Sequence, residues 1–215
     1  MCQPPAVAPE VNARSTAGWI VATTLWFLCA CAGSGALSLY SGQAGAPGRQ
    51  PGDWPLGAMP AATPAATRLL VFLHPHCPCA QATLAELQRA LATSRVSLTC
   101  RLLFTVPPGA APDWEQGRLL DAARQLAPAQ VLLDREGALA RRFGVETSGH
   151  VLVYRDDGRL AFSGGITALR GHQGDNPGAA ALAALLSGAE PQRAAAPVFG
   201  CPLFDSPLAN AEGAP

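Results

Sequence analysis

The feature that most constrains this chain is a long segment without any charged or histidine side chain. Between Arg14 and Arg49 there is no Asp, Glu, Lys, Arg or His. Within this interval residues 17–40 read AGWIVATTLWFLCACAGSGALSLY, and a helix needs about 20 apolar residues to cross a bilayer. Trp19 and Tyr40 lie near its two ends, where aromatic side chains favour the membrane interface. The sequence therefore predicts a single transmembrane anchor over residues 17–40.

Two other interpretations of this segment stay open. A cleaved signal peptide has a similar composition, but the segment is long for the apolar core of such a peptide, and no clear A-x-A cleavage site follows it. Lipoprotein processing is suggested by Cys31, which stands three residues after Leu28 in a lipobox-like spacing, with an unusual cysteine between them. The few arginines near the segment give little positive-inside bias, so they do not orient it.

The composition argues against several classes of function. The 215 residues suffice for one medium domain with extensions. The formal net charge is zero, so we expect no basic face for nucleic acid. Walker motifs, nucleophilic serine motifs and catalytic carboxylate pairs are absent from the sequence, which argues against nucleotide and hydrolase chemistry.

The chain is expected to hold one folded domain between less regular regions. Residues 41–67 are rich in Gly, Ala and Pro, which predicts a semi-extended tether. The domain is expected to span residues 68–190. An N-terminal tail of residues 1–16 precedes the anchor, and a C-terminal tail of residues 191–215 follows the domain.

Within the domain, strand-like and helix-like patterns alternate. Pro78 is tolerated in a first helical turn, Asp113 is a suitable N-cap, and Asn176 followed by Pro177 is typical of a helix start. Asp157–Gly158 predicts the turn of a hairpin. This order predicts an α/β domain with a mixed sheet and helices on both faces. The expected strands are residues 68–74, 96–104 and 129–134 with the hairpin 150–165, and the expected helices are residues 77–94, 113–126, 135–145 and 176–190.

A cysteine pair, Cys77 and Cys79, stands at the start of the first expected helix of the domain. The thiolate is the reactive form of cysteine, and a helix N-terminus lowers the pKa of a thiol. The adjacent His76 adds a possible positive charge. We therefore expect Cys77 to be an exposed attacking thiol and Cys79 its resolving thiol. A disulfide across one intervening residue closes a small, strained ring, which favours exchange or isomerisation over strong reduction.

Cys201 has two open interpretations, a second redox partner for Cys77 or a packing role within VFGCPLF. It follows the last expected helix by about a dozen residues, and an extended chain gains roughly 3.3 Å per residue, so the tail is long enough to reach the cysteine pair. Cys100 lies inside an expected strand and is interpreted as an inert core residue. Cys2 and Cys29 are expected to have no role.

Three motifs carry a resemblance to a known family: FLHPHCPC, SGGITALRGHQGDN and VFGCPL. Together they resemble the RedB group of bacterial thioredoxin-like proteins. The element order of residues 68–190 resembles the thioredoxin fold, and VLLDREGALARRFGV resembles a segment of the membrane-anchored TlpA/ResA group. The resemblance implies a thiol–disulfide oxidoreductase. The sequence departs from thioredoxins in its C-x-C spacing and in Gly149, which stands where thioredoxins place a cis-proline.

The histidines suggest an alternative function of a different class. If the fold is thioredoxin-like, all four lie at the end of the sheet that carries the cysteine pair. Two thiolates and an imidazole suit copper(I) or zinc. Thioredoxin-like copper chaperones combine cysteines at this position with a more distant histidine, so the resemblance implies Cys77, Cys79 and His172 as ligands of a copper-delivery protein. The histidines are His74, His76, His150 and His172.

The glycine-rich loop SGGITALRGHQGDN, residues 163–176, is a further candidate. Its glycines permit close backbone approach to a partner, and Arg170 is placed to hold an anion near the start of the last helix. A structural loop with turn glycines is the alternative. The sequence as a whole predicts a membrane-anchored oxidoreductase on the extracytoplasmic, periplasmic side, where a cysteine pair cycles with a thiol or disulfide protein as its partner.

Overall fold

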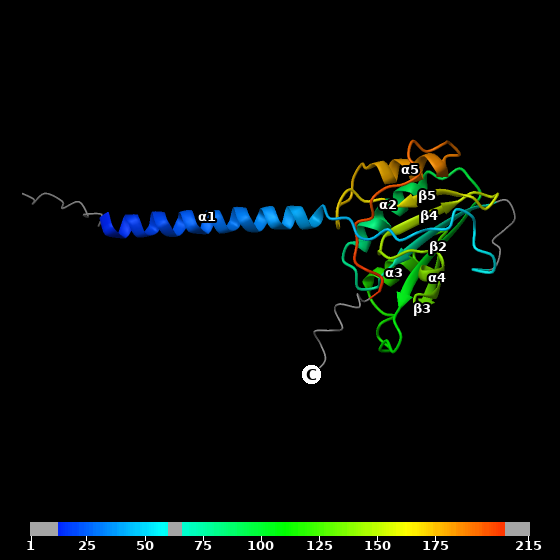
Figure 1. Ribbon diagram of the computed structural model, residues 1–215, viewed down its shortest axis with the longest axis horizontal. Coiled ribbons are helices and arrows are strands. Elements are labelled where there is room, and N and C mark those ends of the chain that lie inside the picture. Colours follow the sequence, from blue (N-terminus) through cyan, green and yellow to red (C-terminus); the bar gives the residue numbers. More distant parts are fainter. Residues whose placement is uncertain (1–12, 60–65, 205–215) are drawn as a thin grey trace, which may run out of the picture. The chain divides into compact units, whose positions relative to one another are not determined.

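The computed structural model describes residues 13–59 and 66–204 and divides the chain into two compact units, Met1–Tyr40 and Ser41–Pro215. The first unit holds α1 (Ala13–Ser41), a single helix (Figure 1). The most apolar 18-residue stretch within Ala17–Ser41 has a mean hydropathy of 1.7, and none of that stretch is buried. Apolar residues lie all around this helix, as expected for a helix surrounded by lipid. It is long and apolar enough to cross a membrane, although a signal sequence meets the same test.

The second unit is built on a five-stranded mixed sheet in the order β3-β2-β1-β4-β5 (Figure 1). The pairs β1–β2 and β2–β3 are parallel, and the pairs β1–β4 and β4–β5 are antiparallel. This is the thioredoxin-like arrangement that the sequence predicted. The central strand β1 is a continuous apolar run because both of its faces are covered. The strands are β1 (Thr67–Leu73), β2 (Leu98–Val106), β3 (Gln130–Arg135), β4 (His150–Tyr154) and β5 (Leu160–Gly164).

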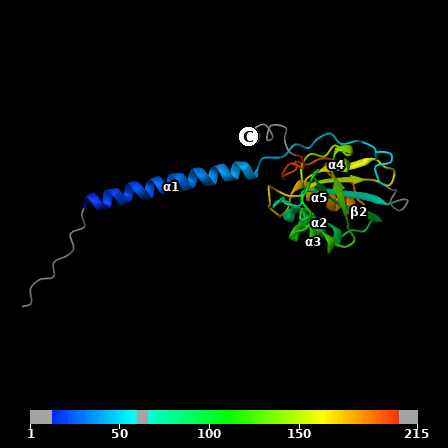
Figure 2. The ribbon, with the colours of Figure 1, turned by 90° about the horizontal axis from the view of Figure 1, so that it is seen from below.

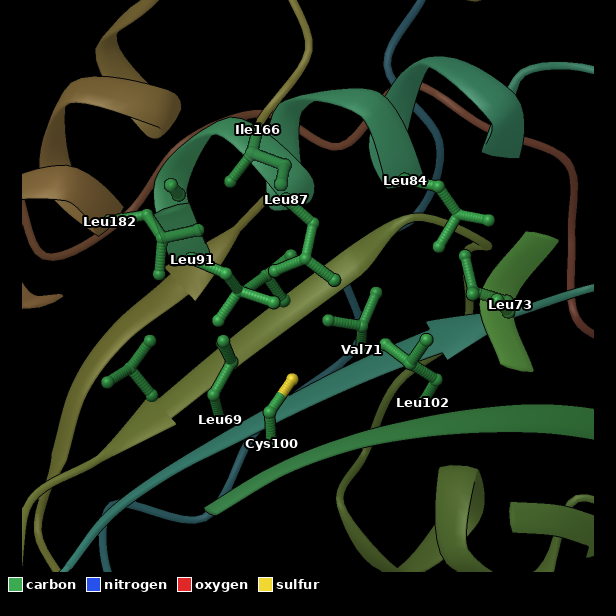
Figure 3. Packing of buried hydrophobic residues seen from close by; sticks show 14 of the residues in the cluster. Leu69, Val71, Leu73, Leu84, Leu87, Leu91, Cys100, Leu102, Ile166 and Leu182 are labelled. Atoms are coloured by element: carbon green, nitrogen blue, oxygen red, sulfur yellow. The ribbon is translucent and has the colours of Figure 1, made fainter. Parts of the chain in front are cut away.

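Four helices cover the two faces of the sheet, which places one hydrophobic core on each face (Figure 2). Side chains alternate along a strand, so Leu69 and Val71 enter one core while Leu70 and Phe72 enter the other. The first core lies under α2, α3 and α5 (Figure 3), and the second lies under α4. The helices are α2 (Ala80–Ala92), α3 (Arg118–Arg124), α4 (Ala138–Arg142) and α5 (Pro177–Leu186).

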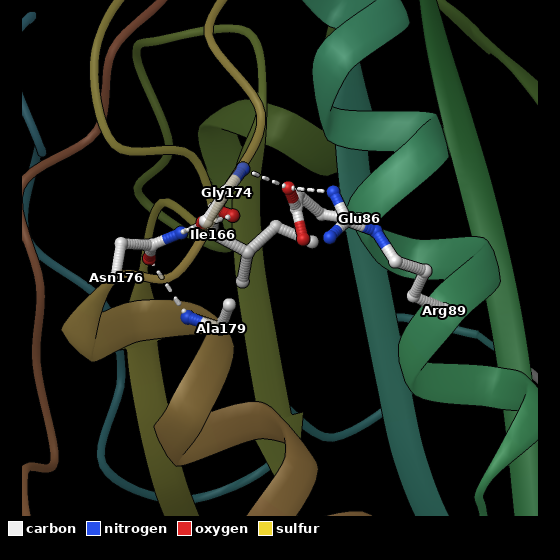
Figure 4. Close-up of polar contacts among 6 residues, drawn as sticks. All are labelled: Glu86, Arg89, Ile166, Gly174, Asn176 and Ala179. Atoms are coloured by element: carbon white, nitrogen blue, oxygen red, sulfur yellow. Dashed lines mark hydrogen bonds and ion pairs between the residues drawn. The ribbon is translucent and has the colours of Figure 1, made fainter.

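Two of the predicted helix starts are wrong and one is confirmed. The helix expected from Asp113 begins at Arg118, because the preceding residues form hydrogen-bonded turns and Gly117 has a positive φ of 135°, a conformation that favours glycine and not a helix. α2 begins at Ala80 with Cys79 as its N-cap, so Pro78 lies before the first turn rather than in it. Asn176 caps α5 as predicted, and its Oδ1 accepts a hydrogen bond of 2.9 Å from the backbone of Ala179 (Figure 4).

The segment expected to be a tether packs against the domain over its described part. Trp54 lies at ring-centroid distances of 5.2 Å from Phe143 and 5.3 Å from Tyr154. The hydroxyl of Tyr154 donates to the carbonyl of Pro51 at 2.9 Å. The compact unit therefore begins at Ser41 rather than near residue 68. Composition alone does not reveal such contacts, because they join this segment to distant strands.

The C-terminal tail also packs on the domain as far as residue 204. It pairs with β5, where the backbone of Ser163 donates to Ala194 at 2.9 Å and accepts from Ala196 at 3.2 Å. Val198 is 1% exposed and Leu203 is 5% exposed, so the tail contributes to the cores. Cys2, most of the N-terminal tail, residues 60–65 and residues 205–215 lie outside the described residues.

Candidate thiol site

Cys77 occupies a tight turn between β1 and α2. Its backbone donates to the carbonyl of His74 at 3.0 Å, and its own carbonyl accepts from Ala80 at 3.1 Å. The residue is only 2% exposed, so the prediction of an exposed thiol is wrong. Cys79, the N-cap of α2, is partly exposed. The candidate attacking thiol is therefore the less accessible member of the cysteine pair.

The C-terminal tail brings a third cysteine to this turn. Pro202 forms an antiparallel bridge with Thr147, and the carbonyl of Cys201 accepts from the backbone of Ser148 at 2.8 Å. Cys201 is among the groups that lower the pKa of the Cys77 thiol, which places the tail beside this turn. Cys77, Cys79 and Cys201, here named the thiol cluster, are all free thiols in this structure. The tail thus reaches the cysteine pair, as its length allowed.

Cys77 is the member of the thiol cluster that most readily ionises. Burial alone raises the pKa of its thiol, but hydrogen bonds from the side chain and backbone of Cys201, the hydroxyl of Ser148 and the backbone of Cys79 together lower the pKa below the ordinary value of 9.0. These donors stabilise the thiolate directly. Cys77 consequently combines very low exposure with a tendency to carry negative charge.

The other two members of the cluster hold their protons. Burial raises the pKa of Cys79, and the neighbouring Cys77 thiolate raises it further. Burial and the hydrogen bond to Cys77 raise the pKa of Cys201 to about 12, and Arg170 opposes the shift in both residues. Cys77 is therefore the thiol of the cluster that ionises first as the pH rises, beside two neighbours that keep their protons to higher pH.

Ser148 is a functional residue that the sequence reasoning missed. Its hydroxyl accepts from the backbone of His74 at 2.9 Å, which directs the hydroxyl proton toward Cys77. The adjacent Gly149 has a φ of 89°, and its backbone donates to Phe72 at 2.7 Å. A proline at this position has no N–H to make that bond. The available signal was the serine next to the glycine that replaces the expected cis-proline.

His74 and His76 lie beside the cysteine turn, but the groups that lower the pKa of Cys77 do not include His76. The backbone of His76 donates to Nδ1 of His74 at 3.2 Å. The two imidazoles pack around Trp114, with ring centroids 5.4 Å and 4.5 Å from the indole. The expected electrostatic role of His76 is therefore filled by Ser148 and Cys201.

His150 lies at the predicted end of the sheet, but its side chain is on the opposite face from Cys77. It is paired in register with Phe72, whose side chain enters the second core, whereas Cys77 belongs to the first. His150 is completely buried, and its Nε2 is 2.8 Å from the hydroxyl of Ser163. Burial lowers the pKa of His150 to about 4. The residue has a structural position and does not contact the thiol cluster.

The expected copper ligands are not assembled. His172 is exposed, and its Nδ1 hydrogen-bonds to the carbonyl of Arg170 at 2.8 Å. Within residues 13–59 and 66–204, no group of three or more His, Cys, Asp or Glu side chains is arranged to hold a metal ion. The set of Cys77, Cys79 and His172 therefore does not form a site in this structure.

Arg170 binds carbonyl groups of the chain instead of standing ready for an anion at α5. Its Nη1 donates to the carbonyl of Gly200 at 2.5 Å, and its Nε donates to Gln43 at 3.1 Å. It therefore fastens the tail directly next to Cys201. The rest of the glycine-rich loop is held by Glu86, only 5% exposed, which accepts from the backbone of Gly174 at 2.7 Å and pairs with Arg89 (Figure 4).

Comparisons with known proteins find similarity in structure but none in sequence families. No protein-family model matches the chain, and no curated protein matches it. A hypothetical protein from Sinorhizobium meliloti 1021 is similar in structure, with 17% identity, a TM-score of 0.52, and coverage of 67% of this chain and 82% of that chain.

An uncharacterized conserved protein from Geobacillus kaustophilus has 19% identity and a TM-score of 0.52, covering 74% of this chain and 92% of that chain. A secreted Mycobacterium tuberculosis disulfide oxidoreductase, described as homologous to E. coli DsbE, has 20% identity and a TM-score of 0.34, covering 45% of this chain and 66% of that chain. At these identities, the likeness to the Sinorhizobium and Geobacillus proteins concerns the fold alone.

Proposed function

We propose that the domain is a thiol–disulfide exchange protein in which Cys77 is the attacking thiolate. The observation that carries this proposal is that the tail brings Cys201 to the turn of Cys77 and Cys79, and that only Cys77 of the three has a lowered pKa. Hydrogen-bond donors lower the pKa of Cys77, while the pKa values of Cys79 and Cys201 are raised. Exchange requires one thiolate that attacks and a neighbouring thiol that resolves the mixed disulfide.

The proposed reaction has two balanced steps. The Cys77 thiolate attacks one sulfur of a partner disulfide, a bond forms between these sulfurs, and the partner's other sulfur leaves as a thiolate. Cys79 gives its proton to that thiolate and attacks the Cys77 sulfur. A Cys77–Cys79 disulfide forms, and the partner sulfur that was bonded to Cys77 leaves as a thiolate. Two electrons pass from the domain to the partner, and the reverse sequence oxidises a dithiol partner.

Cys201 is the alternative resolving thiol. It lies close enough to Cys77 for its side chain and its backbone to lower the pKa of the Cys77 thiol. A Cys77–Cys79 bond closes a ring around Pro78 alone, whereas a Cys77–Cys201 bond joins two distant segments without such a small ring. The two products differ in which peptides become cross-linked, so peptide mapping separates them.

The cellular placement belongs to the same proposal. Helix α1 anchors the chain, and the domain lies on the extracytoplasmic side, where a redox-active cysteine pair encounters oxidising surroundings. The length and hydropathy of Ala17–Ser41 support the anchor. A thiol or disulfide protein in that compartment is the exchange partner. The resemblance to the RedB group supports this placement as well.

The test is a redox titration of the full chain in detergent, with metal removed. Samples equilibrated with dithiol/disulfide buffers are alkylated and mapped by peptide mass. We expect a reversible disulfide between Cys77 and either Cys79 or Cys201. Thiols that stay reduced across the whole buffer range, up to irreversible oxidation, would refute the proposal.

A further inference from the structure

The end of the described tail pairs with the loop before β4 through main-chain hydrogen bonds, in the way that an added strand pairs with the edge of a sheet. The backbone of Ser148 donates to Cys201 at 2.8 Å, and the backbone of Leu203 donates to Glu146 at 2.9 Å. Between these bonds, Pro202 is bridged to Thr147 in antiparallel fashion. Main-chain bonds of this kind are how an extended peptide is added to an exposed backbone edge. The edge Glu146–Ser148 is therefore able to bind an extended peptide through its main chain, so that most side chains of the peptide do not affect binding.

The seated tail presents a thiol to the reactive sulfur. Cys201 lies beside Cys77, and both its side chain and its backbone act to lower the pKa of the Cys77 thiol. Cys77 is only 2% exposed, whereas Cys201 is partly exposed. A disulfide of another protein has no direct path to the Cys77 sulfur while Cys201 lies there. Attack on a partner by Cys77 thus requires the tail to leave.

Two positions beside Cys201 restrict what this edge accepts. A Cβ atom at Gly200 would overlap the carbonyl oxygen of Ser148, so the residue before the cysteine must be glycine. Gly200 is not among the positive-φ glycines, so this requirement is steric and not conformational. Two residues after the cysteine, Leu203 is 5% exposed and packs in the second core. The edge therefore selects glycine before the cysteine and a large apolar residue two positions after it.

We propose that residues 199–203 are a built-in substrate mimic, and that the edge Glu146–Ser148 binds an extended, cysteine-bearing segment of a partner protein with the pattern Gly-Cys-x-apolar. The inference rests on the proposed function, because it assigns the partner class of the same thiol site. The partner segment takes over the main-chain bonds of the tail and places its own sulfur against Cys77. Arg170, which holds the carbonyl of Gly200, is then available for the equivalent carbonyl of the partner.

The first experiment displaces the tail without altering a thiol. Gly200→Ala in the full chain is compared with Gly52→Ala, where an added Cβ meets no atom within 4 Å. The rate of iodoacetamide reaction at Cys77 is mapped by peptide mass from pH 6 to 10. The high-pH plateau reports access and the midpoint reports the pKa. We expect the plateau to rise at least fivefold in Gly200→Ala, with wild-type behaviour in Gly52→Ala. A plateau equal to wild type in folded Gly200→Ala overturns the proposal.

The second experiment fills the vacated edge with a redox-inert peptide. The probe is a fluorescent heptapeptide with the sequence of residues 198–204 and serine in place of its cysteine. Fluorescence anisotropy should show saturable binding to Gly200→Ala and at least tenfold weaker binding to wild type, whose own tail occupies the edge. A matched peptide with alanine in place of its glycine should not bind. Equal binding of both peptides contradicts the proposed selectivity.

A chain ending at Val198 serves as the second variant if Gly200→Ala does not fold. If neither variant gives the circular dichroism of the folded domain, the tail is a fixed structural element and the proposal is overturned. Peptide binding without any reversible disulfide in the titration refutes the proposed function and leaves the peptide edge intact. A reversible disulfide without peptide binding refutes the peptide edge and leaves the proposed function intact.

Discussion

Cys77 and Cys100 are buried to the same degree but differ in ionisation. Their exposed fractions are 2% and 1%. Burial raises the pKa of Cys100 to about 12, whereas the pKa of Cys77 is lowered despite burial. The comparison shows that loss of solvent does not by itself make a thiol inert. The number of hydrogen-bond donors aimed at the sulfur decides whether the thiolate is stable.

The difference follows from where each residue sits relative to the sheet. Cys100 lies within β2 opposite Leu69, and its backbone groups belong to the ladder while its side chain faces aliphatic neighbours (Figure 3). Cys77 follows β1, in a turn where backbone N–H groups have not yet entered a helix. Such groups, together with Ser148, are free to donate to a sulfur. A strand interior offers no equivalent donors.

The largest expected effect is loss of exchange on removal of Cys77. Cys77→Ser should abolish reaction with a model peptide disulfide, because no other described thiol of the cluster has a lowered pKa. Cys100→Ser, the matched control, should retain wild-type exchange. The readout is the rate of mixed-disulfide formation followed by peptide mass. Wild-type rates in both variants would remove Cys77 from the reaction.

The second expected effect is that Cys77 and Cys100 change the free energy of unfolding with pH in opposite directions. The folded pKa of Cys100 is about 12 and the ordinary value is 9.0, so its contribution is complete below pH 9 and is lost as the pH rises toward 12. The depressed pKa of Cys77 acts oppositely, with stability present above the ordinary value and lost as the pH falls through the folded pKa.

Denaturant unfolding of wild type and Cys100→Ala between pH 8 and 11 checks this difference. Above pH 9 the free energy of unfolding should fall more steeply in wild type, by up to about 1.4 kcal/mol per pH unit. Taking the difference between the two chains removes the shared contributions of Tyr154 and Cys201, whose pKa values are also raised. Parallel curves would show that Cys100 titrates normally.

A smaller effect is expected from the thiol donor of the tail. Cys201→Ala removes the thiol that contributes most to lowering the pKa of Cys77 and keeps the backbone contribution of residue 201. The pKa of Cys77 should rise by about one unit, the size expected for a hydrogen bond to a charged group. The measurement is the midpoint pH of Cys77 alkylation. An unchanged midpoint would mean that the tail thiol does not stabilise the thiolate.

The smallest expected effect belongs to Ser148. Its hydrogen bond to Cys77 ranks after those of Cys201, so Ser148→Ala should raise the alkylation midpoint by less than one unit. Ser187→Ala, an exposed serine whose hydroxyl bonds only locally to Ala184, is the control. A shift larger than that of Cys201→Ala would reverse the order of the two donors.

The sequence predicted the features that rest on local or periodic signals. The continuous apolar β1, the Asp157–Gly158 turn and the Asn176–Pro177 helix start are of this kind, and they carry the fold. Features set by long-range main-chain pairing were not predictable. Trp54 packs against Tyr154, and the tail around Cys201 pairs with Thr147, and both partners are distant in the chain.

Within the site, the sequence placed the right cysteines near one another but misjudged their surroundings. Cys77 was expected to be exposed because nothing local indicates that a distant tail will cover it. His150 was placed at the end of the sheet that leads to Cys77, but its face was not predicted because the two-residue alternation of the strand was not considered. Residues 150, 152 and 154 of the strand point to the same face, and Leu152 and Tyr154 both lie in the second core. His150 therefore faces the second core.

The seated tail has a kinetic consequence for whatever reacts at Cys77. A group tethered within one chain competes at an effective concentration on the order of millimolar even for a flexible connection, and a fixed arrangement raises it further. Cys201 is held against Cys77 by backbone bonds on both sides. Small disulfides at lower concentrations are therefore poor competitors for the Cys77 sulfur. The tail insulates the thiolate from the bulk thiol pool while it remains reachable for a macromolecule that binds the same edge.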